Sequence, residues 1–271
     1  MPSTEKPTLA VALIVKNEAQ NLNDCLKTVA DWVDEIVVLD SGSTDETEHV
    51  ARKYTDKFYE NKQWPGFGPQ RRLAQEYVKS DFVLWLDADE RVTDELKSSI
   101  QQAVEKNESN TLYSICRLSW VFGRYIRHCG WYPDRVVRLY PTKLTQYDTA
   151  QVHEKVLVDK SMVVQVLSGD AIHFTYNDLE HYLKKSNSYA LAWSADKAKQ
   201  GKKGSFSSII THALACFIKM YIIKTGFLDG KQGLLLSMLS THYTIVKYSD
   251  LWIRTSTKKH DMREFHKQNV N

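Results

Sequence analysis

Two aspartates that follow a short apolar run constrain this chain more than any other feature. Phe82-Val83-Leu84-Trp85 has the pattern of a buried strand, and Leu86-Asp87-Ala88-Asp89-Glu90 comes directly after it. Ligands of open α/β sheets bind outside the carboxyl ends of the strands, where this Asp-x-Asp pair would lie. Hard divalent cations such as Mg2+ take oxygen ligands and keep substrate phosphates in their coordination shell. The pair predicts a clamp for a metal and a diphosphate. Alone, however, such a pair is more often a solvated acidic turn.

The sequence upstream alternates between strand and helix patterns, which favours a metal–diphosphate site over a solvated turn. Apolar runs at 9–15 and 35–40 are typical of strands, a short third strand is expected at 56–60, and helical patterns follow at 22–33, from 44 and at 68–79. Such alternation predicts a parallel sheet with right-handed crossovers. Acids end three of these strands, at Glu18, Asp40 and Asp87/Asp89. Because the carboxyl ends of parallel strands converge on one crevice, three acids in succession indicate a site rather than turn chemistry.

Composition indicates a globular protein with an unevenly distributed charge. The 271 residues are 42% hydrophobic, enough for one good core and an appendage. Residues 201–271 carry eleven Lys/Arg against four Asp/Glu, which suggests an anionic partner such as a phospholipid or a phosphorylated glycan; a solvated helical face is the alternative. We expect no nucleic-acid partner. Cys25, Cys116, Cys129 and Cys216 lack metal-site spacing, and the N-terminus lacks a secretion signal, so we expect reduced, mostly buried thiols in a cytoplasmic protein.

The last third of the chain has helical periodicity. We expect helices over 178–199, 205–226 and 234–246. His212, Lys219 and Lys224 interrupt the second of these, so we expect it not to span a bilayer but to lie in the interface, or to belong to an ordinary helical subdomain. The basic tail from Lys258-Lys259 to Lys267 fits the interfacial alternative. The expected domains are therefore 1–177 and a helical, basic region over 178–271.

The motifs ALIVKNEAQNL, EIVVLDSGSTDET and LWLDADE together resemble the inverting glycosyltransferases of family 2 over roughly the first 100 residues. The resemblance implies a GT-A fold, which is α/β and Rossmann-like, with a mostly parallel sheet and flanking helices; here a C-terminal helical subdomain would follow it. By resemblance, Glu18 and Asp40 contact the nucleotide, Asp87 faces ribose or a metal-bound water, and Asp89 ligates the metal. Arg71 could neutralise the diphosphate. Ser41 stands where the family often has a second Asp.

Sugar transfer also requires a general base to take the proton of the attacking hydroxyl. Trp131-Tyr132-Pro133-Asp134 and Val152-His153-Glu154 resemble motifs of the bacterial lipopolysaccharide core glucosyltransferase branch. Glu154 is the favoured base and Asp134 the alternative. By resemblance, His173 is an additional metal or phosphate ligand.

The resemblance therefore implies metal-dependent (Mg2+ or Mn2+) transfer of a hexose, with glucose favoured, from a UDP-sugar to a heptose of the lipopolysaccharide or lipooligosaccharide inner core. Such an enzyme would work peripherally at the cytoplasmic face of the inner membrane, against anionic lipid. The alternatives are a transferase acting on another lipid-linked or polysaccharide glycan, and a non-catalytic nucleotide-sugar-binding module. Nicotinamide binding is disfavoured because no G-x-G-x-x-G follows the first strand.

Overall fold

The chain folds into two compact units. The computed structural model describes residues 6–176 and 178–256. The first unit comprises Met1–Trp120 and Trp131–Thr175, and the second comprises Val121–Gly130 and Tyr176–Asn271. The second unit thus includes residues 121–130, which the expected boundary at 177/178 assigned to the first domain. The basic tail that contains Lys258, Lys259 and Lys267 lies outside the described residues.

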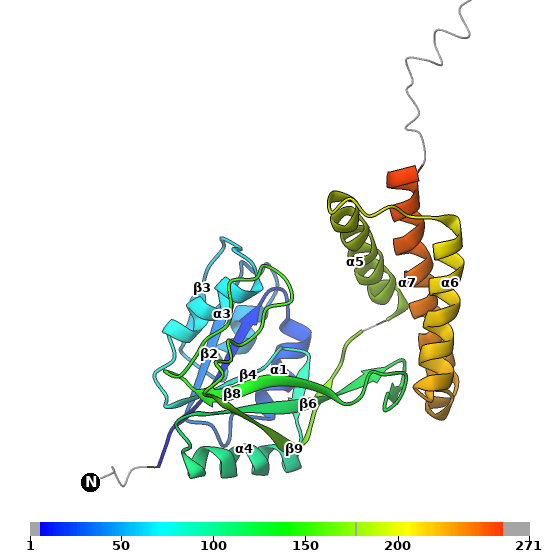
Figure 1. The fold of residues 1–271 in the computed structure, drawn as a ribbon. Helices are drawn as coiled ribbons and strands as arrows, with labels where there is room; N and C mark the ends of the chain where they lie inside the picture. Colours follow the sequence, from blue (N-terminus) through cyan, green and yellow to red (C-terminus); the bar gives the residue numbers. More distant parts are fainter. Residues whose placement is uncertain (1–5, 177, 257–271) are drawn as a thin grey trace, which may run out of the picture. The chain divides into compact units, whose positions relative to one another are not determined.

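The first unit is built on one sheet whose N-terminal half is parallel (Figure 1). The strand order is β3-β2-β1-β4-β8-β6-β9-β5. The first four are β3 (Phe58–Glu60), β2 (Glu35–Asp40), β1 (Leu9–Val15) and β4 (Phe82–Trp85), and all three pairs among them are parallel. The rest are β8 (Asp134–Pro141), β6 (Thr111–Val121), β9 (Val163–His173) and β5 (Glu90–Val92). Of these, β8 is antiparallel to both β4 and β6, whereas β9 is parallel to β6 and antiparallel to β5. The α/β class expected from the alternating pattern is confirmed.

Strand β1 shows why its sequence is apolar at every position. Leu9, Val11 and Leu13 join a core on one face of the sheet, whereas Ala10 and Ala12 join a second core on the other face. Successive side chains of a strand point to opposite faces, so a strand covered on both sides needs a continuous apolar run. Helices α1 (Ala19–Lys27), α2 (Thr47–Ala51) and α4 (Asp94–Lys106) supply the first core, and α3 (Phe67–Glu76) supplies the second. Figure 1 shows α4 and α3 on opposite sides of the sheet.

Some elements differ in their bounds from the expected ranges. Helix α2 begins at Thr47 rather than at Thr44, because the preceding residues are held by another loop: the Thr44 N–H donates to Asn17 Oδ1, and Asp45 Oδ2 accepts from the Ala19 N–H. Helix α1 ends at Lys27, and the apolar pattern beyond it continues in turns, where Val29 still packs into the core.

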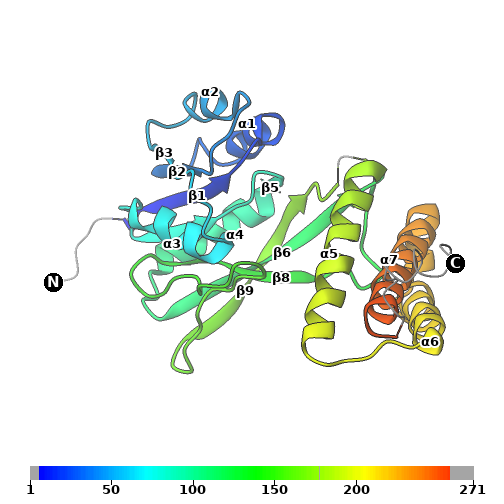
Figure 2. The same cartoon turned by 90° about the horizontal axis from the view of Figure 1, so that it is seen from above.

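The second unit is mainly helical. It contains α5 (Leu179–Lys199), α6 (Phe206–Phe217), the π-helical turn η1 (Ile218–Ile223), the 3-10 turn η2 (Gly226–Asp229) and α7 (Gly230–Ser256), besides the two-residue strand β7 (Arg124–Tyr125). Helices α5 and α6 both pack on α7 (Figure 2). The expected helix at 234–246 is thus 27 residues long, because its pattern extends in both directions. Among the described residues, one stretch, Phe206–Ile223, has the length and apolar composition to cross a membrane. The expectation that it does not cross one stays a prediction.

The four cysteines agree with the expected environment. Cys25, Cys116 and Cys129 are buried, Cys216 is half-buried, and none is in a disulfide.

Candidate active site

Hydrogen bonds join the loops after β1 and β2 at the carboxyl edge of the parallel sheet. Asn17 Oδ1 accepts from the Thr44 N–H at 2.8 Å, and the Asn17 N–H donates to Ser43 Oγ at 2.8 Å. The Glu18 N–H donates to Thr47 Oγ1 at 2.9 Å. These bonds between the two loops satisfy backbone N–H groups that have no partner in a helix or strand. They hold Glu18 and the end of β2 next to one another.

Asp40, which ends β2, is buried and organises its own loop. Its Oδ2 accepts from the Gly42 N–H at 2.8 Å and the Ser43 N–H at 2.7 Å, and its Oδ1 accepts from the Ser43 hydroxyl. Gly42 has φ 82°, a conformation that costs glycine little. The geometry thus gives Asp40 a turn-forming role, in addition to the nucleotide contact expected of it.

Glu18 lies in a negatively charged environment. Burial raises the pKa of Glu18, the charges of Asp89, Asp45 and Asp87 raise it further, and a hydrogen bond from Asn21 Nδ2 at 3.0 Å opposes them. The acids that follow β1 and β4 are therefore close enough to repel one another. A cation at this edge would relieve that repulsion.

Asp87 is held by two buried arginines. Arg71 Nη2 donates to its Oδ1 at 2.6 Å, and Arg138 Nη2 donates to its Oδ2 at 2.5 Å. Burial alone would raise the pKa of Asp87, but Arg138 and Arg71 outweigh it and hold the pKa well below its usual range. Both oxygens of this ionised carboxylate are engaged by charge-assisted hydrogen bonds. Asp87 is therefore fixed in place by β8 and α3.

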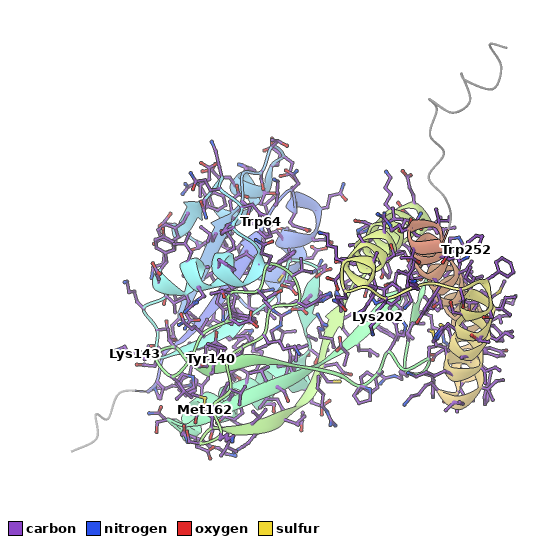
Figure 3. The ribbon with its side chains drawn as sticks, turned by 45° about the horizontal axis from the view of Figure 1, so that its top comes forward. Trp64, Tyr140, Lys143, Met162, Lys202 and Trp252 are labelled. Carbon is purple, nitrogen blue, oxygen red and sulfur yellow. The ribbon has the colours of Figure 1, made fainter. Side chains whose placement is uncertain are left out.

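The same arginine of α3 also reaches Glu154. Arg71 Nε donates to Glu154 Oε1 at 3.0 Å, so one guanidinium joins the favoured base to the Asp-x-Asp segment. The guanidinium carbon lies 5.3 Å from the ring centroid of Trp85 and 5.0 Å from that of Tyr147, and Nη1 is buried with no hydrogen-bond partner among the residues that the structure describes. Tyr140 on β8 (Figure 3) accepts from Trp85 Nε1 at 2.8 Å, which fixes one of these rings.

Asp134, the alternative base, belongs to a neighbouring ion pair. Its Oδ2 accepts from Arg117 Nε at 2.8 Å, and the side chain is 38% exposed. Arg117 Nη1 lies 3.6 Å from Oε1 of Glu90, a fully buried carboxylate whose Oε2 accepts from the Asp87 N–H at 2.9 Å. Burial raises the pKa of Glu90, and the charge of Asp87 adds to that rise. Asp134 is thus linked to Asp87 through Arg117 and Glu90.

Asp89 and His173 form the other side of the site. Their Oδ2 and Nε2 atoms are 3.3 Å apart, and Glu90 of β5 pairs with His173 of β9 in the sheet. Burial lowers the pKa of His173, but the adjacent Asp89 carboxylate outweighs it and gives a net rise. Within the described ranges, no three or more His, Cys, Asp or Glu side chains are arranged to hold a metal ion. Two protein donors and diphosphate oxygens would nevertheless suit Mg2+ or Mn2+, because these ions are bound by few side chains together with substrate phosphates.

The structure thus brings most of the expected residues to one edge of the sheet. Arg71, Asp87 and Glu154 are in direct contact, as are Asp89 and His173, whereas Asp134 lies beyond Arg117. Sequence reasoning missed Arg117 and Glu90 as members of the charged network; it gave Arg138 only as a weaker candidate for contact with the diphosphate or an acidic acceptor, not as a partner of Asp87. Arg117 gives no local signal, since a lone arginine in a strand pattern predicts nothing about its partners; Glu90 adjoins the aspartate pair and could have been included.

Comparisons with known proteins identify the same family that the sequence motifs indicate. Residues 10–160 match the family model described as glycosyl transferase family 2. An uncharacterized glycosyltransferase of Rickettsia prowazekii is 28% identical over 240 residues, which cover 85% of this chain and 82% of that protein. The lipopolysaccharide core biosynthesis glycosyltransferase LpsC of Rhizobium meliloti is 24% identical over 264 residues, or 93% of this chain and 95% of LpsC. Glucosyl-3-phosphoglycerate synthase of Mycobacterium tuberculosis, solved with Mg2+ and uridine diphosphate, aligns with a TM-score of 0.36 and 23% identity over 42% of this chain and 44% of that one.

Proposed function

The chain belongs to glycosyl transferase family 2 and is a glycosyltransferase, and from that premise we propose that it transfers a hexose, with glucose favoured, from a UDP-sugar to a heptose of the lipopolysaccharide inner core. The reaction inverts the anomeric centre and depends on Mg2+ or Mn2+. The acceptor assignment is supported by the similarity to LpsC, whose name refers to lipopolysaccharide core biosynthesis, along nearly the whole of both chains.

One observation carries the catalytic part of this proposal. Arg71 is bound at once to Asp87 of the Asp-x-Asp segment and to Glu154. The same buried group thus holds both the Asp-x-Asp segment, to which we assign the donor, and the base, and a fixed geometry between reacting groups lowers the barrier of a single displacement.

Glu154 accepts the acceptor proton in this proposal. Its Oε1 is bound to Arg71, and in the described part of the chain no hydrogen bond engages its Oε2. As the acceptor hydroxyl oxygen forms a bond to the anomeric carbon, its proton passes to Oε2 of Glu154. The bond from the anomeric carbon to the diphosphate oxygen breaks, and its electron pair leaves with the nucleoside diphosphate. Asp134 is the alternative base; its oxygen Oδ2 is already bound to Arg117.

Asp89 and His173 would hold the divalent metal, which when bound stabilises the negative charge of the leaving diphosphate as a Lewis acid. In this proposal Glu18, which follows β1, and Asp40, which ends β2, contact the nucleotide. Asp87, which Arg71 and Arg138 hold, faces the ribose or a metal-bound water in the same proposal. Because the acceptor is lipid-linked, we assign the enzyme to the cytoplasmic face of the inner membrane.

Donor binding and hydrolysis across a panel of nucleotide sugars, each with Mn2+, Mg2+ or EDTA, tests the proposal. We expect metal-dependent binding of one UDP-sugar, and transfer of its sugar to a heptose-terminated core acceptor. If the protein binds a UDP-sugar but transfers the sugar only to another glycan, the heptose is not the acceptor and that glycan takes its place in the proposal. A folded protein that binds no nucleotide sugar would instead be a non-catalytic module.

A further inference from the structure

An exposed apolar stripe runs along α6 and η1, and Phe206 at its start also contacts Trp252 of α7. Five large apolar residues recur at every fourth position of this segment, and each is 48–62% exposed: Phe206, Ile210, Leu214, Ile218 and Ile222. Residues four apart lie on the same side of a helix, so these side chains form one continuous surface, called here the apolar stripe. Exposed apolar residues scattered singly are ordinary, but a continuous row marks an interaction surface.

A neighbouring face of the same helix is already in use. Ile209 and Ala213, three residues after Phe206 and Ile210, are buried, and α6 packs along α7 (Figure 2). The helix therefore has two adjacent apolar faces, of which one is covered within its own unit; just 11% of the stretch Phe206–Ile223 is buried. The second surface requires a partner of its own.

The charges beside the stripe indicate an anionic partner. Lys202, Lys203, Lys219 and Lys224 are all exposed, and residues 201–226 contain no Asp or Glu. Lys202 lies in the turn that precedes α6 (Figure 3). A second copy docked through the stripe by a two-fold axis would bring these lysines toward their own equivalents, with no acids on the segment to compensate. A bilayer with anionic headgroups provides both an apolar layer and the opposite charge.

The stripe fits the surface layer of a bilayer better than a span of it. Length does not decide between the two, but His212 and Lys219 lie within this stretch and would have to be buried in hydrocarbon by a span. An in-plane helix leaves His212 stacked on Tyr248 of α7 and keeps Lys219 at the headgroups, while the stripe faces the acyl chains.

We propose that the apolar stripe of α6 and η1 inserts into the interfacial layer of an anionic bilayer, with the flanking lysines on the headgroups. The inference extends the proposed function, since it names the surface by which a transferase with a lipid-linked acceptor would reach its substrate. Its evidence, however, is the exposed apolar stripe and the flanking lysines, and it does not depend on which sugar is transferred.

Flotation of the full-length protein with vesicles tests the proposal. Vesicles of phosphatidylcholine alone are compared with vesicles containing phosphatidylglycerol. The stripe variant is Ile210→Ser/Ile218→Ser, and the matched control is Leu157→Ser/Val158→Ser, whose side chains are each 49% exposed in the first unit. We expect the stripe variant to bind phosphatidylglycerol vesicles roughly 30-fold more weakly than wild type, from the apolar area of two half-exposed isoleucines, and the control to bind normally. Lys219→Gln/Lys224→Gln should weaken binding to the anionic vesicles alone.

Several results would overturn the proposal. One is a wild-type protein that does not float with anionic vesicles, and a second is a stripe variant that floats as well as the control. Another is resistance of the cellular protein to extraction by alkaline carbonate, which would indicate a spanning helix. The last is a dimer in solution that the stripe variant dissociates. Nucleotide-sugar binding, measured on the same preparations, separates this proposal from the proposed function: either can fail while the other holds.

Discussion

Replacing Asp87 by asparagine should destabilise the first unit far more than the same replacement at Asp89. Asp87 neutralises two arginines whose side chains are only 3% and 7% exposed. Removing one partner of a buried ion pair costs about 3–5 kcal/mol, because the other charge stays buried without compensation. The Asp87 carboxylate is itself 30% exposed, and Arg71 keeps its contact with Glu154, so the lower end of that range applies, about 3 kcal/mol.

Asp89→Asn is the matched control, two residues away in the same loop. The Asp89 side chain is 26% exposed, and its ion pair is a single contact of 3.3 Å with His173. Its loss removes one contact instead of two, and a neutral His173 leaves no buried charge behind, so the free energy of unfolding should fall by about 1 kcal/mol. If Asp89 holds the metal, however, this variant loses metal-dependent donor binding and transfer while it stays folded.

Urea unfolding at pH 7 and thermal unfolding measure the stability difference. We expect the melting temperature of Asp87→Asn to fall by roughly 10 °C, given about 3 °C per kcal/mol for a unit of this size. Calorimetric titration with UDP and Mn2+ measures donor binding in parallel. If Asp87→Asn unfolds within 1 kcal/mol of wild type, the two arginines do not depend on this carboxylate and our account of the site is wrong.

Further expected results concern the base, the metal and the pH dependence. Glu154→Gln should bind donor like wild type and lose transfer in single-turnover assays; if Asp134→Asn does so instead, the ranking of the two bases is reversed. EDTA should abolish donor binding and Mn2+ should restore it, and equal affinity with and without metal would contradict the assignment of Asp89. Burial raises the pKa of Glu35, but hydrogen bonds from Lys57 and Ser80 outweigh it and lower the pKa. The stability from Glu35 is thus present above about pH 4.3 and is lost as pH falls through the lower folded-state pKa. In urea titrations from pH 6 to pH 3, the difference between wild type and Glu35→Gln should shrink; a constant difference would exclude this linkage.

The fold and the family could be predicted because their signals are local. The continuous apolar run of β1 identifies a strand covered on both faces, and the motifs around Glu18, Asp40 and Asp87 identify the glycosyltransferase family, which the family comparison confirms. The α/β, GT-A-type class is confirmed as well. Helix ends were less predictable because side chains from other loops set them: Asn17 holds Thr44 out of α2.

The sequence by itself determined which residue types end the strands, and therefore that acids gather at the carboxyl edge of the sheet. Only the tertiary structure decided which charges meet. Arg71 of α3 lies 83 residues from Glu154, and Arg138 of β8 lies 51 residues from Asp87. Arg138 reaches Asp87 because β8 pairs with β4 in antiparallel register. Arg71 reaches the site because α3 packs on the face of the sheet that carries Trp85 and Tyr140. The apolar stripe likewise depends partly on the sequence and partly on the folded structure. Periodicity predicts an apolar helix, but which side α7 covers depends on packing, and packing is a property of the folded chain.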